Sequence, residues 1–160
     1  MRSPLAATIL ATTRDAAWAP ILVFTVHMIA SRGLGLYGPY PWLDVPMHAA
    51  GGIAIAYFFH RALVLAGRHG VLAPFHALTH VLFVLALVGT TTVLWEFAEF
   101  LSDRYLGTHA QAGLGDTLLD MLLGIAGGAA LVGALALRAG TRRVSLDRVG
   151  DGARATEISR

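Results

Sequence analysis

The sequence predicts an all-α protein, a polytopic membrane helical bundle with about four transmembrane helices. Of its 160 residues, 56% are hydrophobic and only 14% are charged, and the mean hydropathy is +0.63. Soluble domains carry roughly 25% charged residues. The composition therefore excludes a water-surrounded globule and a disordered nucleic-acid-binding arm, and no nucleic-acid partner is expected. The chain has no cysteine, so it has no disulfide framework and no thiolate metal ligand.

Four apolar stretches are long enough to approach or cross a hydrocarbon core about 30 Å thick, which needs about 20 helical residues. They cover residues 16–31 (with an extension toward 37), 46–66, 71–101 and 114–137. Residues 1–15 are expected to be an N-terminal cytoplasmic segment, 16–138 the transmembrane helical domain and 139–160 a mobile cytoplasmic tail. A signal peptide is the alternative interpretation of the start, but Arg14 and Asp15 interrupt the run before the main apolar segment.

The arginines predict the orientation. Most of them lie in the two terminal segments and in the second connection, whereas only Arg32 and Arg104 lie in the other two connections. Arginine accumulates on the cytoplasmic side of membrane proteins. We therefore expect a multi-pass protein of the bacterial inner membrane with both termini in the cytoplasm, and with the first and third connections outside.

Acidic residues and one histidine gather at the predicted outer ends of three helices. Asp44 and His48 begin the second helix, Glu96, Glu99 and Asp103 close the third, and Asp116 and Asp120 open the fourth. Ionisable groups in the apolar zone usually face the bundle interior and have a function. Small residues beneath them, including Gly51, Gly52 and Gly127, would let the second and fourth helices approach closely. The alternative is that Asp44, Asp103 and Asp116 only cap helix ends.

The other histidines and the tryptophans favour different interpretations. His60, His69, His76 and His80 fall toward the inner side, where they are expected to pack helices or to lie at the membrane interface. His27 lies in the outer half of the first helix, from which it can point into the acidic cluster. Trp18, Trp42 and Trp95 lie near helix ends and are typical of membrane-interface anchors.

Several of these residues carry a family resemblance. Trp95-Glu96-Phe97-Ala98-Glu99, Leu106-Gly107-Thr108 and Gly115-Asp116-Thr117 with Asp120-Met121, together with the earlier Asp44, His48 and Gly51, resemble the YjdF-like family of small bacterial inner-membrane proteins of unknown function. The pattern is more distantly similar to VanZ-like membrane proteins, which carry an aspartate and histidine pair on one helix and acidic residues on later ones. The resemblance implies a helical membrane fold and a shared polar site, without a known reaction.

Three functions remain open from the sequence. The first is a metal-dependent membrane hydrolase that acts on an envelope lipid or lipid-linked substrate. In it a divalent metal ion is held by His48, Glu96, Glu99 and Asp120, and Asp44 or Asp116 orients a ligand or acts as general base. The second is a proton- or cation-coupled transporter. The third is a structural or accessory subunit whose glycine-rich faces pack a partner. Membrane lipids and a second copy of the chain are the other expected partners.

Overall fold

The computed structural model describes residues 3–73 and 76–158, and the side chains of these residues as far as 138. Its described residues form helices and connections without strands, which confirms the all-α fold. The helices are α1 (Pro4–Ala16), α2 (Trp18–Met28) with a π-helical turn (Ile29–Gly33), a 3-10 turn (Pro41–Leu43), α3 (Asp44–Arg68), α4 (Ala77–Leu106) and α5 (Leu114–Ile158).

The described part contains three single helices and one bent pair that could cross a membrane. Mean hydropathy reaches 1.5 in Pro41–Arg68 and 2.0 in both Ala77–Leu106 and Leu114–Arg138, and α1 with α2 forms the bent fourth candidate. Large apolar side chains such as Ile21, Leu82 and Leu122 are exposed on the helices, which suits contact with lipid. The predicted bundle of about four spans is confirmed on length and composition.

The first candidate span differs from the predicted helix. Helical structure begins at Pro4 rather than near residue 16, and α1 meets α2 at an angle of 51°. The break lies at Ala17, and Pro20 follows it. Because Pro20 has no N–H to donate to the carbonyl of Ala16, the helical hydrogen bonds are interrupted there. The charged residues Arg14 and Asp15 therefore end α1 instead of preceding the first helix.

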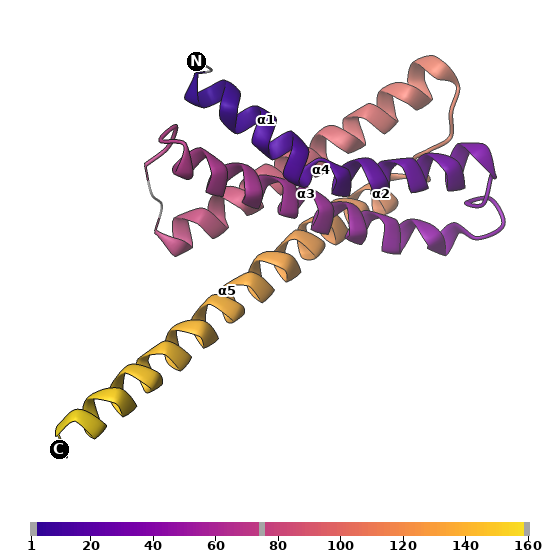
Figure 1. Cartoon of the computed structure of the whole chain (residues 1–160). Coiled ribbons are helices and arrows are strands. Elements are labelled where there is room, and N and C mark those ends of the chain that lie inside the picture. Colours follow the sequence, from indigo (N-terminus) through magenta and orange to yellow (C-terminus); the bar gives the residue numbers. More distant parts are fainter. Residues whose placement is uncertain (1–2, 74–75, 159–160) are drawn as a thin grey trace.

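Two other helix bounds also differ from the predicted ones. α4 begins at Ala77 and not at 71, because the amides of Val71 and Leu72 donate to the carbonyl of Ala66 and complete the end of α3. The backbone of α5 continues to Ile158 and projects away from the other helices (Figure 1). The mobility expected for residues 139–160 stays a prediction.

α3 is the central helix, and it contacts each of the other four. The buried core consists of Ala56, Val84, Val88 and Val132, contributed by α3, α4 and α5. α3 and α5 cross at small residues. Gly52 faces the backbone of Gly124, so that a Cβ atom at position 52 would collide with it. Gly127 meets Ala49 in the same way. This close approach is the one expected from the glycines.

The direction of the helices brings four helix ends together. α2 and α4 end, and α3 and α5 begin, on the right-hand side of Figure 1. We call this the site end of the bundle, and the side where α3 ends and α4 begins the opposite end. The predicted acidic residues all belong to helix segments at the site end.

Candidate functional site

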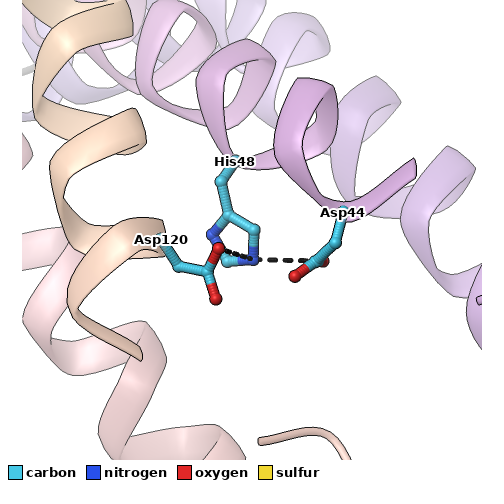
Figure 2. Close-up of side chains that lie close together, drawn as sticks. All are labelled: Asp44, His48 and Asp120. Atoms are coloured by element: carbon cyan, nitrogen blue, oxygen red, sulfur yellow. Dashed lines mark ion pairs between the residues drawn. The ribbon is translucent and has the colours of Figure 1, made fainter. Parts of the chain in front are cut away.

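Two carboxylates and one imidazole converge at the site end. Asp44 and His48 occupy the first two turns of α3, and Asp120 lies in the second turn of α5. The Nε2 atom of His48 is 3.3 Å from Oδ1 of Asp44 and 3.8 Å from Oδ1 of Asp120 (Figure 2). Each of the three side chains offers a ligand atom, and these atoms lie within 4.8 Å of one another. We call these three residues the Asp-His-Asp cluster.

The helix crossing positions the Asp-His-Asp cluster. His48 lies one turn before Gly52 on α3, and Asp120 lies one turn before Gly124 on α5. Since both helices start at the site end and touch at these glycines, His48 and Asp120 are brought to the same side of the crossing. Only 4% of Asp120 is exposed, and His48 is largely buried, so the cluster sits inside the bundle rather than on its lipid-facing surface.

Two of the four predicted metal ligands do not join this cluster. Glu96 is only 6% exposed and accepts a hydrogen bond from Nε2 of Gln111 at 3.3 Å. Glu99 accepts one from the indole N–H of Trp95 at 3.0 Å. Both carboxylates still interact electrostatically with His48. The structure thus unites His48 and Asp120 with Asp44, which was predicted to orient a ligand or act as a base, and places Glu96 and Glu99 beside them.

Asp103 and Asp116, the other acidic residues predicted at the site end, stabilise the connection between α4 and α5. Asp103 accepts hydrogen bonds from the amides of Ala110 (2.8 Å) and Gln111 (3.0 Å), and from the Thr108 hydroxyl. Asp116 accepts from the amide of Ala112 at 3.1 Å. These contacts fit the alternative in which the two aspartates stabilise helix ends. Asp116 nevertheless also lines a cavity beside the cluster.

Two cavities border the Asp-His-Asp cluster, one lined by Asp44 and the other by His48. The larger, of about 530 Å³, lies at the site end and is lined by polar side chains that include Arg32, Asp44, Glu99 and Asp116; we call it the polar cavity. The smaller, of about 280 Å³, is called the apolar cavity, and its wall includes Phe24, Met47, His48, Gly51 and Ile55. His27 and Trp95 line both cavities and therefore mark their junction.

Aromatic residues at this junction add contacts that the sequence did not reveal. Nδ1 of His27 lies 3.1 Å from the hydroxyl of Tyr37, and its ring packs edge-on against Trp95 at 5.5 Å. Burial, followed by the nearby carboxylates of Asp44 and Glu99, raises the pKa of Tyr37 to about 12. His27 thus lies beside the site without belonging to the Asp-His-Asp cluster, and Trp95 contributes to the cavity walls beyond the interface role expected for it.

Polar residues at the opposite end form separate pairs. His60 and His80 join α3 to α4, with 3.0 Å between Nδ1 and Nε2, and the Thr8 hydroxyl lies 2.8 Å from Nδ1 of His69. Asp15 and Arg61 form an ion pair between α1 and α3. These contacts agree with the expected packing of the histidines and keep them apart from the Asp-His-Asp cluster.

Gln111 and Tyr37 are the site residues that the sequence did not single out. Both lie in connections between helices, where no periodic pattern indicates the direction of a side chain. The only available signal was their position beside the helix ends that carry the acidic residues. Their contacts with Glu96 and His27 depend on how the connections fold back over the bundle.

Comparison with known proteins places the chain in a family. A family model described as "Predicted membrane protein (DUF2238)" matches residues 7–142, and the chain belongs to this family, which corresponds to the YjdF-like resemblance. The chain is also 32% identical over 103 residues to a Thermotoga maritima protein described as "Uncharacterized protein". That alignment covers 64% of this chain and 52% of the relative, so the chain spans about half the relative's length. No solved structure matches. The likeness to VanZ-like proteins stays a prediction.

Proposed function

We propose that this member of the DUF2238 family is a metal-assisted membrane hydrolase that acts on an envelope lipid or lipid-linked substrate. In this proposal the Asp-His-Asp cluster binds one divalent cation, and the site end faces the outside of the bacterial inner membrane. The observation that supports it is the convergence of two carboxylate oxygens and one imidazole nitrogen within 4.8 Å, where Asp44 lines one cavity and His48 lines another.

The chemistry of the cluster suits a cation. Carboxylate oxygens with one imidazole are ligands for ions such as magnesium, manganese, iron and zinc. Within the described side chains, neither Arg32 nor Arg104 forms an ion pair with a carboxylate, so these arginines do not neutralise the cluster. A divalent cation would compensate the buried Asp120 and, once bound, could activate water for hydrolysis.

The remaining residues receive roles that differ in part from the sequence prediction. The sequence assigns Asp44 to the catalytic pair with Asp116. We assign it to the metal ligands instead, because its carboxylate and that of Asp120 both lie close to Nε2 of His48. Asp116 lines the polar cavity and stays the candidate general base. Glu96 and Glu99 shape the charge around His48 from their own hydrogen-bonded positions.

The structural-subunit alternative loses part of its support. It requires the glycine-rich faces of α3 and α5 to be free for a partner, but Gly52, Gly124 and Gly127 pack against each other's helices within the chain. The transporter alternative gains no support, because the titratable groups at the opposite end pair with one another and not with the Asp-His-Asp cluster. The metal-assisted enzyme therefore remains the better-supported function.

Elemental analysis of the purified protein tests the metal. We expect about one divalent ion per chain, and a loss of most of it in His48→Gln. His60→Gln is the matched control, because it removes the same chemistry from the same helix at the opposite end. Wild-type protein that holds no metal after purification and after incubation with manganese or zinc would refute the proposal.

Cysteine labelling tests the orientation. A single cysteine at Thr108, in the connection after α4, should react in intact cells with a membrane-impermeant thiol reagent, whereas one at Ser145 should not. The cysteine-free background makes each signal unambiguous. Labelling at 145 alone would place the site end in the cytoplasm and exclude an outer-leaflet substrate.

A further inference from the structure

We infer that the ligand of this site is an anionic amphiphile drawn from the membrane, with its apolar chain in the apolar cavity and its anionic headgroup in the polar cavity. This inference rests on the proposed function and names the class of substrate. It follows from three features: charged side chains line only one of the two cavities, apart from histidine, the cavities adjoin at His27 and Trp95, and α2 and α4 are separated along this wall.

The two cavities match the two parts of an amphiphile. Phe24, Met47 and Ile55 line the apolar cavity, and small Gly51 leaves room in its wall. The polar cavity begins where this wall ends, at His27 and Trp95. A molecule that fills both cavities would therefore bury its chain among apolar side chains and bring its headgroup beside Asp44, one member of the Asp-His-Asp cluster.

Arg32 favours an anionic headgroup. Arg32 lines the polar cavity and forms no ion pair with the described side chains. The three carboxylates in the same cavity already have partners. Asp44 lies against His48, Glu99 accepts a hydrogen bond from Trp95, and Asp116 accepts one from the amide of Ala112. Guanidinium groups bind phosphate and carboxylate oxygens in a bidentate manner. A cation in the cluster and Arg32 would together offer two positive groups to one anionic head.

The wall between α2 and α4 offers a path from the membrane. In the described structure these two helices do not approach to within 8 Å between any pair of Cα atoms. Side chains bridge them: the ring centroid of Trp95 lies 6.0 Å from that of Phe24 and 5.5 Å from that of His27, both in edge-to-face contacts. Phe24 lines the apolar cavity and is also 49% exposed, so this ring separates the cavity from the lipid side. Rotation of one aromatic side chain would admit an alkyl chain without displacing a helix.

Binding of a defined probe tests the inference. Dodecyl phosphate is titrated into manganese-loaded protein in a neutral detergent, and binding is measured by native mass spectrometry. Gly51→Leu should fill the apolar cavity, because no atom lies within 4 Å of its Cβ position, and should weaken binding at least about tenfold. Gly67→Leu is the matched control on the same helix, with equally open space and outside both cavities.

The headgroup is tested with a second matched pair. Arg32→Gln should weaken dodecyl phosphate binding at least about tenfold, whereas Arg104→Gln, which lies outside both cavities, should leave it unchanged. Inorganic phosphate should compete weakly, because it lacks the chain. Equally tight binding of inorganic phosphate would indicate a free phosphate ligand, and equally tight binding of dodecyltrimethylammonium would exclude an anionic head; either result overturns the inference.

The outcomes separate this inference from the proposed function. Metal-free wild-type protein would refute the proposed enzyme. Wild-type protein that holds metal but binds dodecyl phosphate no better than Gly51→Leu would overturn the inference of an amphiphile and leave the proposed enzyme standing. Metal content is measured on every variant, so that a weakened response of Gly51→Leu is attributed to the cavity only when its metal content equals that of wild type.

Discussion

The two ends of this bundle contain similar residue types in different arrangements. At the site end, three side chains from α3 and α5 converge, with two carboxylates close to the His48 imidazole. At the opposite end the same kinds of side chain meet two at a time, as in the His60–His80 and Asp15–Arg61 contacts. In a pair the two side chains satisfy each other and join two helices, whereas we propose that the three converging ligand atoms bind an ion. Residue type alone therefore does not distinguish a binding site from a packing contact.

Removing a carboxylate from each end gives the largest expected difference. Asp120→Asn should lower metal affinity more than about tenfold, because it removes a carboxylate that we propose as a direct ligand. Asp15→Asn removes a carboxylate from the ion pair with Arg61 and should leave metal affinity unchanged. Affinity is measured by competition with a chelator of known strength. Equal losses in both variants would show that the ends do not differ in the way proposed.

Two glycine substitutions on α3, one at the helix crossing and one near the opposite end, should differ in their effect on the stability of the protein. Gly52→Ala places a methyl group against the backbone of Gly124 and should destabilise the protein by about 1–3 kcal/mol. Gly67→Ala has open space around its Cβ position and should be neutral or slightly stabilising. Thermal unfolding in detergent gives both values. A neutral Gly52→Ala would mean that α3 and α5 do not touch at this crossing.

Glu99→Gln sharpens the boundary of the site. The sequence predicted Glu99 as a metal ligand, but its carboxylate accepts from Trp95 outside the Asp-His-Asp cluster. We expect metal affinity to change less than about threefold, since only a neighbouring charge is lost. The same chelator competition measures it. A loss as large as that of Asp120→Asn would return Glu99 to the ligand set.

Tyr37 gives the smallest and most local effect. In the folded protein the pKa of the Tyr37 phenol is about 12, whereas its reference value is 10.0. The unfolded chain therefore releases this proton first as the pH rises, so stability should fall with increasing pH across the interval from about 10 to about 12. Tyr37→Phe should weaken that dependence and remove one late step from the ultraviolet titration of the tyrosines. Loss of a step near pH 10 in place of the late one would place Tyr37 in open solvent.

The spans were predictable from the sequence because each depends on a continuous apolar run. The start of the first span was not predictable, because charged residues such as Arg14 and Asp15 are typical of the end of a membrane-spanning segment. The partner that accommodates Asp15 is Arg61, a residue on another helix whose proximity depends on packing. The composition of one segment does not indicate such a contact with another helix.

The site was predictable to the level of helix ends. Alternating directions bring His48 and Asp120 to one side, and the glycines beneath them indicate a close approach. The choice among carboxylates was not predictable, because Glu96 and Glu99 lie on a suitable face of α4. Gln111 and Trp95 supply their hydrogen bonds, and these depend on a folded connection and on a side-chain rotamer.

The crossing of Gly52 and Gly124 also determines where the chain can change its length. A residue inserted between His48 and Gly52 would turn the imidazole by about 100° away from Asp120 while the crossing stayed in place. An insertion in α5 beyond Gly127 would lie past both the crossing and Asp120, and would leave the alignment of the cluster intact. Over evolutionary time, the four-residue interval between each proposed ligand and its glycine should therefore exclude insertions and deletions.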